Sequence, residues 1–84
     1  MKNTDKAIIK LKKPITVEGV SLAALEMREP TVADQLASQK QGGSDAEQEL
    51  AMIANLCMVK PEDLHQLTLR DYREVQKAFG GFFA

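Results

Sequence analysis

The corner Arg28-Glu29-Pro30-Thr31 divides the chain into two parts with different hydrophobic periods. Proline disfavours helical backbone at the residue before it, so an extended segment has to end at Glu29. Thr31 can then accept a hydrogen bond from the amide of Asp34, and the Asp34 carboxylate can accept one from the amide of Thr31. This capping box predicts a helix that begins at Val32. The corner therefore separates a region of strands from a region of helices.

Before the corner, the sequence has the period-two alternation of β-strands. We predict a strand over about residues 7–17, a two-residue turn at Glu18-Gly19 and a return strand over about 20–28. The apolar residues expected to face inward are Ile9, Leu11, Ile15 and Val17 on the first strand, and Val20, Leu22, Leu25 and Met27 on the second. The second set changes parity at Ala23-Ala24, which predicts a β-bulge there.

After the corner, helix caps and apolar periodicity predict four short helices, over about residues 32–40, 45–58, 61–67 and 69–79. In the first, Val32 and Leu36 with Ala33 and Ala37 form the apolar face. The second is the most hydrophobic and is expected at the centre, with Met58 in its apolar stripe. Its cap is Ser44 with Glu47, and Thr68 caps the last helix. Gly42-Gly43 and Gly80-Gly81 are expected to end the first and last helices.

These elements predict one α+β domain over residues 1–84, with an N-terminal β-hairpin followed by three to four short helices packed on one face. Two strands alone are marginally stable, so the helices have to cover the sheet. The chain has a single cysteine, which excludes an internal disulfide, and it is short. A partner protein or self-association is therefore a candidate source of further stability.

The sequence contains no recognisable catalytic or metal-binding set, so we predict a protein that is not an enzyme and has no cofactor. His65 is the only histidine and is expected on the surface, while Cys57 lies in an apolar helical stripe and is expected to be a buried thiol. No apolar run reaches the length of a membrane span, and the single thiol fits a reducing cytosol.

Lysines crowd the start of the chain, at Lys2, Lys6, Lys10, Lys12 and Lys13, although the net charge is −1. A small nucleic-acid-binding regulator that uses this lysine-rich strand is the alternative function. No aromatic residues alternate with these lysines, so a solvated strand edge protected from unwanted pairing is the favoured interpretation. We therefore do not expect nucleic acid as a partner.

All three phenylalanines, Phe79, Phe82 and Phe83, lie within the last six residues, and Tyr72 precedes them on the predicted last helix. Such a cluster can pack on the core or can form a docking patch for a partner. Burial is favoured for Phe79, and both alternatives are open for Phe82 and Phe83. We take Tyr72, Phe79, Phe82 and Phe83 as the candidate partner-binding residues.

Several segments occur here in a familiar order. They are Lys-Pro-Ile, a Val-Glu-Gly turn, Leu-x-Met-Arg-Glu-Pro-Thr-Val-x-Asp, Gln-Lys-x-Gly-Gly-Ser-Asp-Ala-Glu-Gln-Glu, Pro-Glu-Asp-Leu and Leu-x-Asp-Tyr. Over about residues 7–83 this order resembles the tail assembly chaperone family of contractile-tailed and Mu-like bacteriophages. The resemblance implies a non-enzymatic protein of the host cytoplasm that binds the tape-measure protein and keeps it soluble during assembly of the tail tube. It also implies that the protein is absent from the mature virion. Further candidate partners are tail tube subunits and a second copy of the chain.

Overall fold

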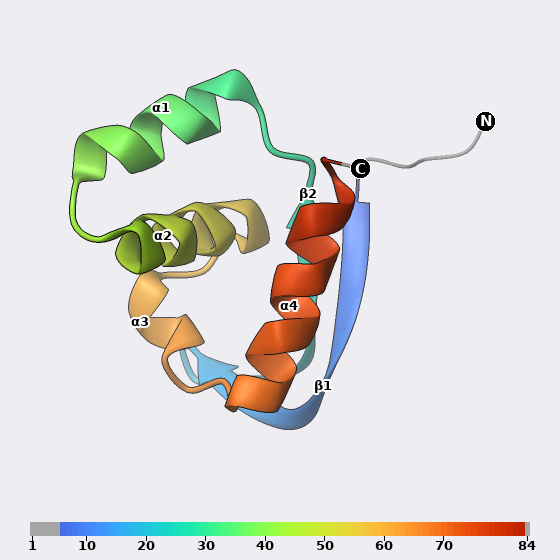
Figure 1. Cartoon of the computed structure of the whole chain (residues 1–84). Helices are drawn as coiled ribbons and strands as arrows, with labels where there is room; N and C mark the ends of the chain where they lie inside the picture. Colours follow the sequence, from blue (N-terminus) through green and yellow to red (C-terminus); the bar gives the residue numbers. More distant parts are fainter. Residues whose placement is uncertain (1–5, 84) are drawn as a thin grey trace.

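The computed structural model describes residues 6–83 (Figure 1). Its elements, in chain order, are β1 (Lys6–Val17), β2 (Val20–Arg28), α1 (Val32–Gln41), α2 (Asp45–Cys57), α3 (Pro61–Leu64) and α4 (Leu69–Gly81). The predicted α+β class, a two-stranded antiparallel hairpin followed by helices, is confirmed. Residues 1–5 and 84, which include Lys2, lie outside the described residues.

The hairpin turns at Glu18-Gly19, as predicted. Both residues have positive φ, 50° for Glu18 and 82° for Gly19, and Val17 pairs with Val20. Positive φ at both central residues is the geometry of the tight turn whose twist matches that of the flanking strands. Glycine adopts this conformation without strain, whereas Glu18 adopts it at some cost in free energy.

The hairpin is irregular where the change of parity at Ala23-Ala24 predicts a bulge, but the extra residues lie on β1. Pairing is regular from Lys6 opposite Arg28 to Lys10 opposite Ala24, and it resumes at Ile15 opposite Leu22. Residues 11–14 of β1 therefore face Ala23 alone. Pro14 contributes to this break because it has no N–H for a ladder hydrogen bond.

The helices cover one face of the hairpin, and the core lies between them. Helices α3 and α4 pack against β1, and α2 packs against β2 (Figure 1). The most completely buried apolar side chains are Ile15, Met27, Ile53, Leu56 and Val75, which come from both strands, α2 and α4. Ile9, Leu11 and Leu25 are buried as the alternation predicts, but Val20, beside the turn, is 58% exposed.

Helix α1 has the reverse of its predicted orientation. Val32 and Leu36, expected to face the core, are 73% and 61% exposed, and the buried side chains of the helix are Asp34 and Ser38. The helix packs chiefly on α2 and lies away from the sheet (Figure 1). The hydrogen bonds of Asp34, described below, determine this rotation about the helix axis.

Three helix ends differ from the prediction. Met58 leaves the apolar stripe of α2, because it adopts the left-handed conformation (φ 60°) as the C-cap and is 86% exposed. Helix α3 ends at Leu64, and residues 65–67 form a turn closed by a bond from the Leu67 amide to the Leu64 carbonyl. Helix α4 continues through Gly80 to Gly81, since glycine only weakens a helix that packing holds in place.

Candidate functional site

The aromatic residues singled out in the sequence lie along α4 and at its C-terminal end. Phe79 and Phe82 are half-buried and pack against the core, and Phe83 is 66% exposed. The rings of Phe79 and Phe83 meet edge to face, with centroids 5.2 Å apart and planes at 82°. Edge-to-face contact is a favoured arrangement of aromatic pairs. The structure therefore brings Phe79 and Phe83 together and leaves Phe83 as the accessible ring.

Tyr72 lies two turns earlier on the same helix, about 10 Å from Phe79 along the axis. It is half-buried against the core. Burial, with a smaller contribution from the charge of Glu49, raises the pKa of the Tyr72 hydroxyl to about 12. The hydroxyl is therefore neutral at physiological pH and has no character of a catalytic base.

The corner that opens α1 is held by the carboxylate of Asp34, which is 8% exposed. It accepts two hydrogen bonds from the Arg28 guanidinium, at 2.7 and 2.9 Å, and others from the amide and hydroxyl of Thr31, at 2.8 and 3.0 Å. The side-chain amide of Asn55 on α2 donates a further bond at 3.0 Å. One carboxylate thus joins β2, the cap of α1 and α2.

Electrostatics stabilise the ionised form of this carboxylate. Hydrogen bonding from Arg28 holds the pKa of Asp34 well below its usual range, although burial acts in the opposite direction. Bidentate pairs between arginine and a carboxylate are among the strongest polar contacts in proteins. The capping box was predicted from the sequence and is confirmed, whereas the bond from Asn55, 21 residues away, has no sequence signal.

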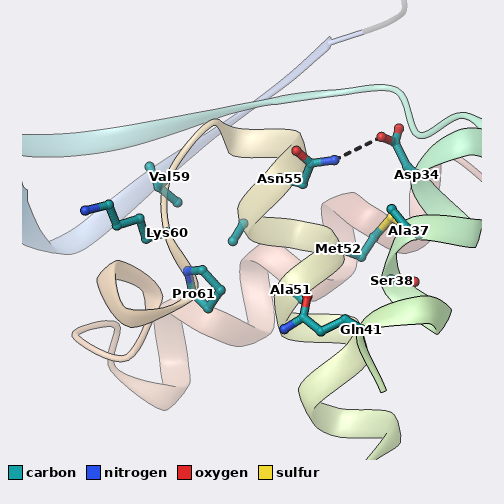
Figure 2. A pocket seen from close by; sticks show the side chains of 11 residues that line it. Asp34, Ala37, Ser38, Gln41, Ala51, Met52, Asn55, Val59, Lys60 and Pro61 are labelled. Atoms are coloured by element: carbon teal, nitrogen blue, oxygen red, sulfur yellow. Dashed lines mark hydrogen bonds between the residues drawn. The ribbon is translucent and has the colours of Figure 1, made fainter. Parts of the chain in front are cut away.

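A cavity of about 350 Å³ lies between α1 and α2 beside this corner (Figure 2). Its lining is mixed, with Asp34, Ser38 and Asn55 supplying polar atoms and Met52, Val59 and Pro61 supplying apolar surface. Figure 2 shows the Asn55 amide directed at Asp34. Ser38 donates to the carbonyl of Gln35, and among residues 6–83 no buried side-chain nitrogen or oxygen lacks a partner. The polar lining is thus already satisfied by the protein.

The reactive residue types do not assemble into a catalytic set. Burial raises the pKa of the Cys57 thiol to about 11, so the thiolate that would act as a nucleophile is scarce at neutral pH. His65 is exposed at the C-terminal end of α3. Residues 6–83 contain no group of three side chains placed to hold a metal ion. In the same part of the chain, no helix has the length and hydrophobicity needed to cross a bilayer.

The lysine-rich strand engages one of its charges and part of its backbone within the protein. Lys6 forms an ion pair with Glu26 at 3.3 Å, and the backbone amides of Lys12 and Lys13 each donate to the Asp71 carboxylate at 3.0 Å. These two amide bonds, in that order, are the main causes of a lowered pKa of Asp71, which is 1% exposed. The strand thus contributes to the fold as well as to the charged surface.

Over residues 6–83 the geometry shows exposed apolar and charged surfaces. Residues 8–84 match the model of a family described as "Phage tail assembly chaperone proteins, E, or 41 or 14". The chain belongs to this family. No curated protein and no solved structure was found to match this tail assembly chaperone.

The family confirms the resemblance seen in the sequence and indicates a role in the assembly of phage tails. A chaperone of this kind binds proteins of the tail, so residues on its surface are the first to consider for binding. The exposed side chains of α1 and of the end of α4 are the first candidates.

Proposed function

We propose that this tail assembly chaperone binds the tape-measure protein and keeps it soluble while the tail tube assembles around it. It acts by binding alone, in the host cytoplasm, and leaves before the virion is complete. The observation that carries the proposal is the family match, which extends over residues 8–84 and so over nearly the whole fold. Tail tube subunits are a second candidate partner.

The surface of α1 supports binding of an apolar partner. Single exposed apolar residues are common on proteins. Val32 and Leu36, however, lie one turn apart on a helix that buries Asp34 and Ser38 in their place. A long helical protein exposes apolar stripes before the tail tube encloses it, and exposed apolar side chains on a chaperone can cover such stripes.

The aromatic end of α4 supplies a second contact. We propose that Phe83 inserts into the partner, that Phe79 and Phe82 hold it in place, and that Tyr72 makes a separate contact two turns earlier on α4. Phe79 and Phe82 are anchored in the core, so the exposed ring of Phe83 is held on a firm base and loses little side-chain entropy on binding. Aromatic anchors of this kind dominate the energetics of many protein interfaces.

Weak contacts made by many copies of the chaperone explain both how it stays on the tape-measure protein and how it is later released. A chaperone has to leave when the tube subunits arrive, so each contact is weak and the sum along a long partner is strong. Small exposed patches on a chain of 84 residues fit such an arrangement better than one large interface.

Co-expression tests this function directly. The tape-measure protein is expressed alone, with the wild-type chain, and with Phe83→Ser, and its soluble fraction is measured. We expect the tape-measure protein to be insoluble alone and soluble with the wild-type chain. With Phe83→Ser, its soluble fraction should fall at least about threefold, because an aromatic anchor is lost. Leu69→Ser is the matched control, since Leu69 is 75% exposed at the other end of α4 and should leave solubility unchanged.

Circular dichroism and thermal melting establish that both variants fold. A tape-measure protein whose solubility does not depend on the chain would overturn the proposed function. Equal solubility with Phe83→Ser and with the wild type would place the contact elsewhere on the surface and remove the role given to the aromatic end of α4.

A further inference from the structure

The outer edge of β1 is closed over one half of the strand and open over the other. The Gln66 side chain accepts a hydrogen bond from the Thr16 amide at 2.9 Å and donates one to the Thr16 carbonyl at 2.7 Å. Asp71 accepts from the amides of Lys12 and Lys13. Within residues 6–83, these are the bonds that reach the backbone of β1 from outside the hairpin, and all lie between residues 12 and 16.

The other half of the edge, over residues 6–11, presents free backbone groups. Side chains alternate between the two faces of a strand, and residues of one face direct their N–H and C=O groups to the same edge. Thr16 faces solvent and directs these groups to Gln66, away from β2. Ile8 and Lys10 also face solvent, since Ile9 is buried, so their N–H and C=O groups point to the same outer edge. Such a row is a template for an added strand.

A groove follows the open half. It has a volume of about 420 Å³ and lies between β1 and α4, with Ile8, Ile9 and Lys10 on one side and Glu74, Lys77 and Ala78 on the other. Figure 1 shows α4 running beside the first part of β1, which then bends at the bottom of the view toward α3. An extended segment placed here pairs with β1 through its backbone and turns alternate side chains toward Ala78.

The charges of β1 and α4 around the groove indicate what kind of segment can bind in it. The cations of β1 and of the exposed surface of α4 are Lys6, Lys10, Lys12, Lys13, Arg70, Arg73 and Lys77. The acids Glu26 and Glu74 pair with Lys6 and Lys77, at 3.3 and 3.6 Å, and the buried Asp71 carboxylate lies against the backbone of Lys12 and Lys13, so these three acids face seven cations. Positive charge therefore remains in excess along the groove, which attracts a segment that carries carboxylates.

A second copy of the chain is disfavoured by the same charges. Antiparallel pairing of two β1 edges about Ile8 would place Lys6 of each copy opposite Lys10 of the other. Like charges directly opposite across two strands are destabilising. Lysines on an edge are also a common protection against self-pairing, and here they leave acidic segments as the favoured partners.

We propose that residues 6–11 of β1 bind an extended segment of a partner protein by strand addition, and that this segment alternates acidic with apolar residues. Its acidic side chains face Lys6 and Lys10, and its apolar side chains pack toward Ala78 of α4. The inference rests on the proposed function in that the partner is a tail protein.

The test uses a fluorescein-labelled peptide of eight residues that alternates glutamate and valine, with binding to the full chain followed by fluorescence anisotropy. Two matched peptides are compared, one alternating lysine and valine and one alternating glutamate and N-methylvaline, which blocks backbone pairing. We expect the first peptide to bind, and each of the others to bind at least about tenfold more weakly, because charge and ladder hydrogen bonds both contribute.

Three variants of the protein locate the site. Ile8→Pro removes a backbone donor of the open edge, where proline is tolerated, and should weaken binding of the acidic peptide at least about tenfold. Ile8→Ala keeps that donor and should stay within about threefold of the wild type, since only side-chain contact is lost. Lys10→Glu reverses an exposed charge without disturbing the core and should also weaken binding at least about tenfold.

Binding that ignores peptide charge or N-methylation, or that survives Lys10→Glu, overturns strand addition. Absence of binding of the acidic peptide overturns it as well, and leaves the proposed function intact if the tape-measure protein is still kept soluble. Binding that shows the expected pattern, with no effect of the chain on the tape-measure protein, supports the edge site and overturns the proposed partner.

Discussion

At the residue scale, two buried aspartates follow the threonine caps of two helices and have different roles. Asp34 accepts from the amide of its own cap, Thr31, and then from Arg28 and Asn55. Asp71 follows Thr68 at the same spacing, but its carboxylate accepts from the irregular part of β1. The same local pattern therefore holds a corner in one case and an interrupted strand in the other.

The charge of Asp34 should make stability depend on pH. Its pKa in the folded protein lies below the unfolded value of about 3.9, so the carboxylate stabilises the fold above that pH. This stabilisation is lost as the pH falls through about 4 toward the folded pKa. We expect the free energy of unfolding, measured in urea at several pH values, to fall less steeply below pH of about 5 in Asp34→Asn than in the wild type.

Asp71 also has a lowered pKa and contributes to the acid loss in both proteins, so the difference between the two curves isolates Asp34. Asp45→Asn, an exposed change in the first turn of α2, is the control for removal of a carboxylate outside the Arg28 pair. Parallel curves for Asp34→Asn and the wild type would contradict the strength assigned to the Arg28 pair.

The cap of α1 gives a second prediction at this scale. Thr31→Ala removes the hydroxyl that accepts from the Asp34 amide, and we expect a loss of about 1 kcal/mol in the free energy of unfolding. Ser21→Ala, an exposed change on β2, should stay within about 0.5 kcal/mol of the wild type. Chemical denaturation of the three proteins measures both values, and equal stability of Thr31→Ala and the wild type would disprove the contribution of the cap.

At the scale of elements, the orientation of α1 is the feature with the largest consequence. The helix buries Asp34 and Ser38 against α2 and directs Val32 and Leu36 outward. If the helix turned to bury Leu36, Asp34 would move away from its partners, and the ion pair and the bond from Asn55 would be lost. Loss of the partners of a buried carboxylate is strongly unfavourable. A polar contact thus determines which face of an otherwise ambiguous helix meets the protein.

Substitution of two leucines distinguishes the two orientations of α1. Leu36 is 61% exposed and Leu56 on α2 is 1% exposed. We expect Leu36→Gln to change the free energy of unfolding by less than about 0.5 kcal/mol, and Leu56→Ala to lower it by about 2–5 kcal/mol through the cavity it creates. A large loss of stability in Leu36→Gln, measured by urea denaturation, would mean that α1 buries its apolar face.

At the scale of the whole molecule, the core is shared among elements far apart in sequence. Ile15, Ile53 and Val75 meet in one buried cluster. A chain of this length has little surplus stability, so local openings extend readily through such a core. The single cysteine lies in this cluster and reports on its integrity.

The reactivity of Cys57 should therefore follow unfolding of the whole core. With a pKa of about 11, its thiolate fraction at pH 8 is about one in a thousand, and the side chain is also shielded from reagent. We expect slow reaction with Ellman's reagent in the native protein and rapid reaction in concentrated urea. Leu56→Ala should react faster than the wild type, whereas Leu36→Gln should not, and rapid labelling of the native wild type would contradict burial of the thiol.

Interactions between neighbouring residues specify the local structure of this protein. Strand alternation, the Glu18-Gly19 turn, Pro30 and the threonine and serine caps act between neighbouring residues, so the order and type of the elements followed from them. The ordered motifs also indicated the family. Aromatic clustering drew attention to Phe83, whose role in binding stays a prediction.

How the elements face one another depends on contacts between residues that are far apart in the sequence. The bond from Asn55 to Asp34 joins residues 21 positions apart, and it turns α1 against its apolar pattern. The bonds from Lys12 and Lys13 to Asp71 join residues 59 and 58 positions apart, close part of the β1 edge and leave the rest open. Such contacts have no sequence period, because they depend on which surfaces the packed core brings together.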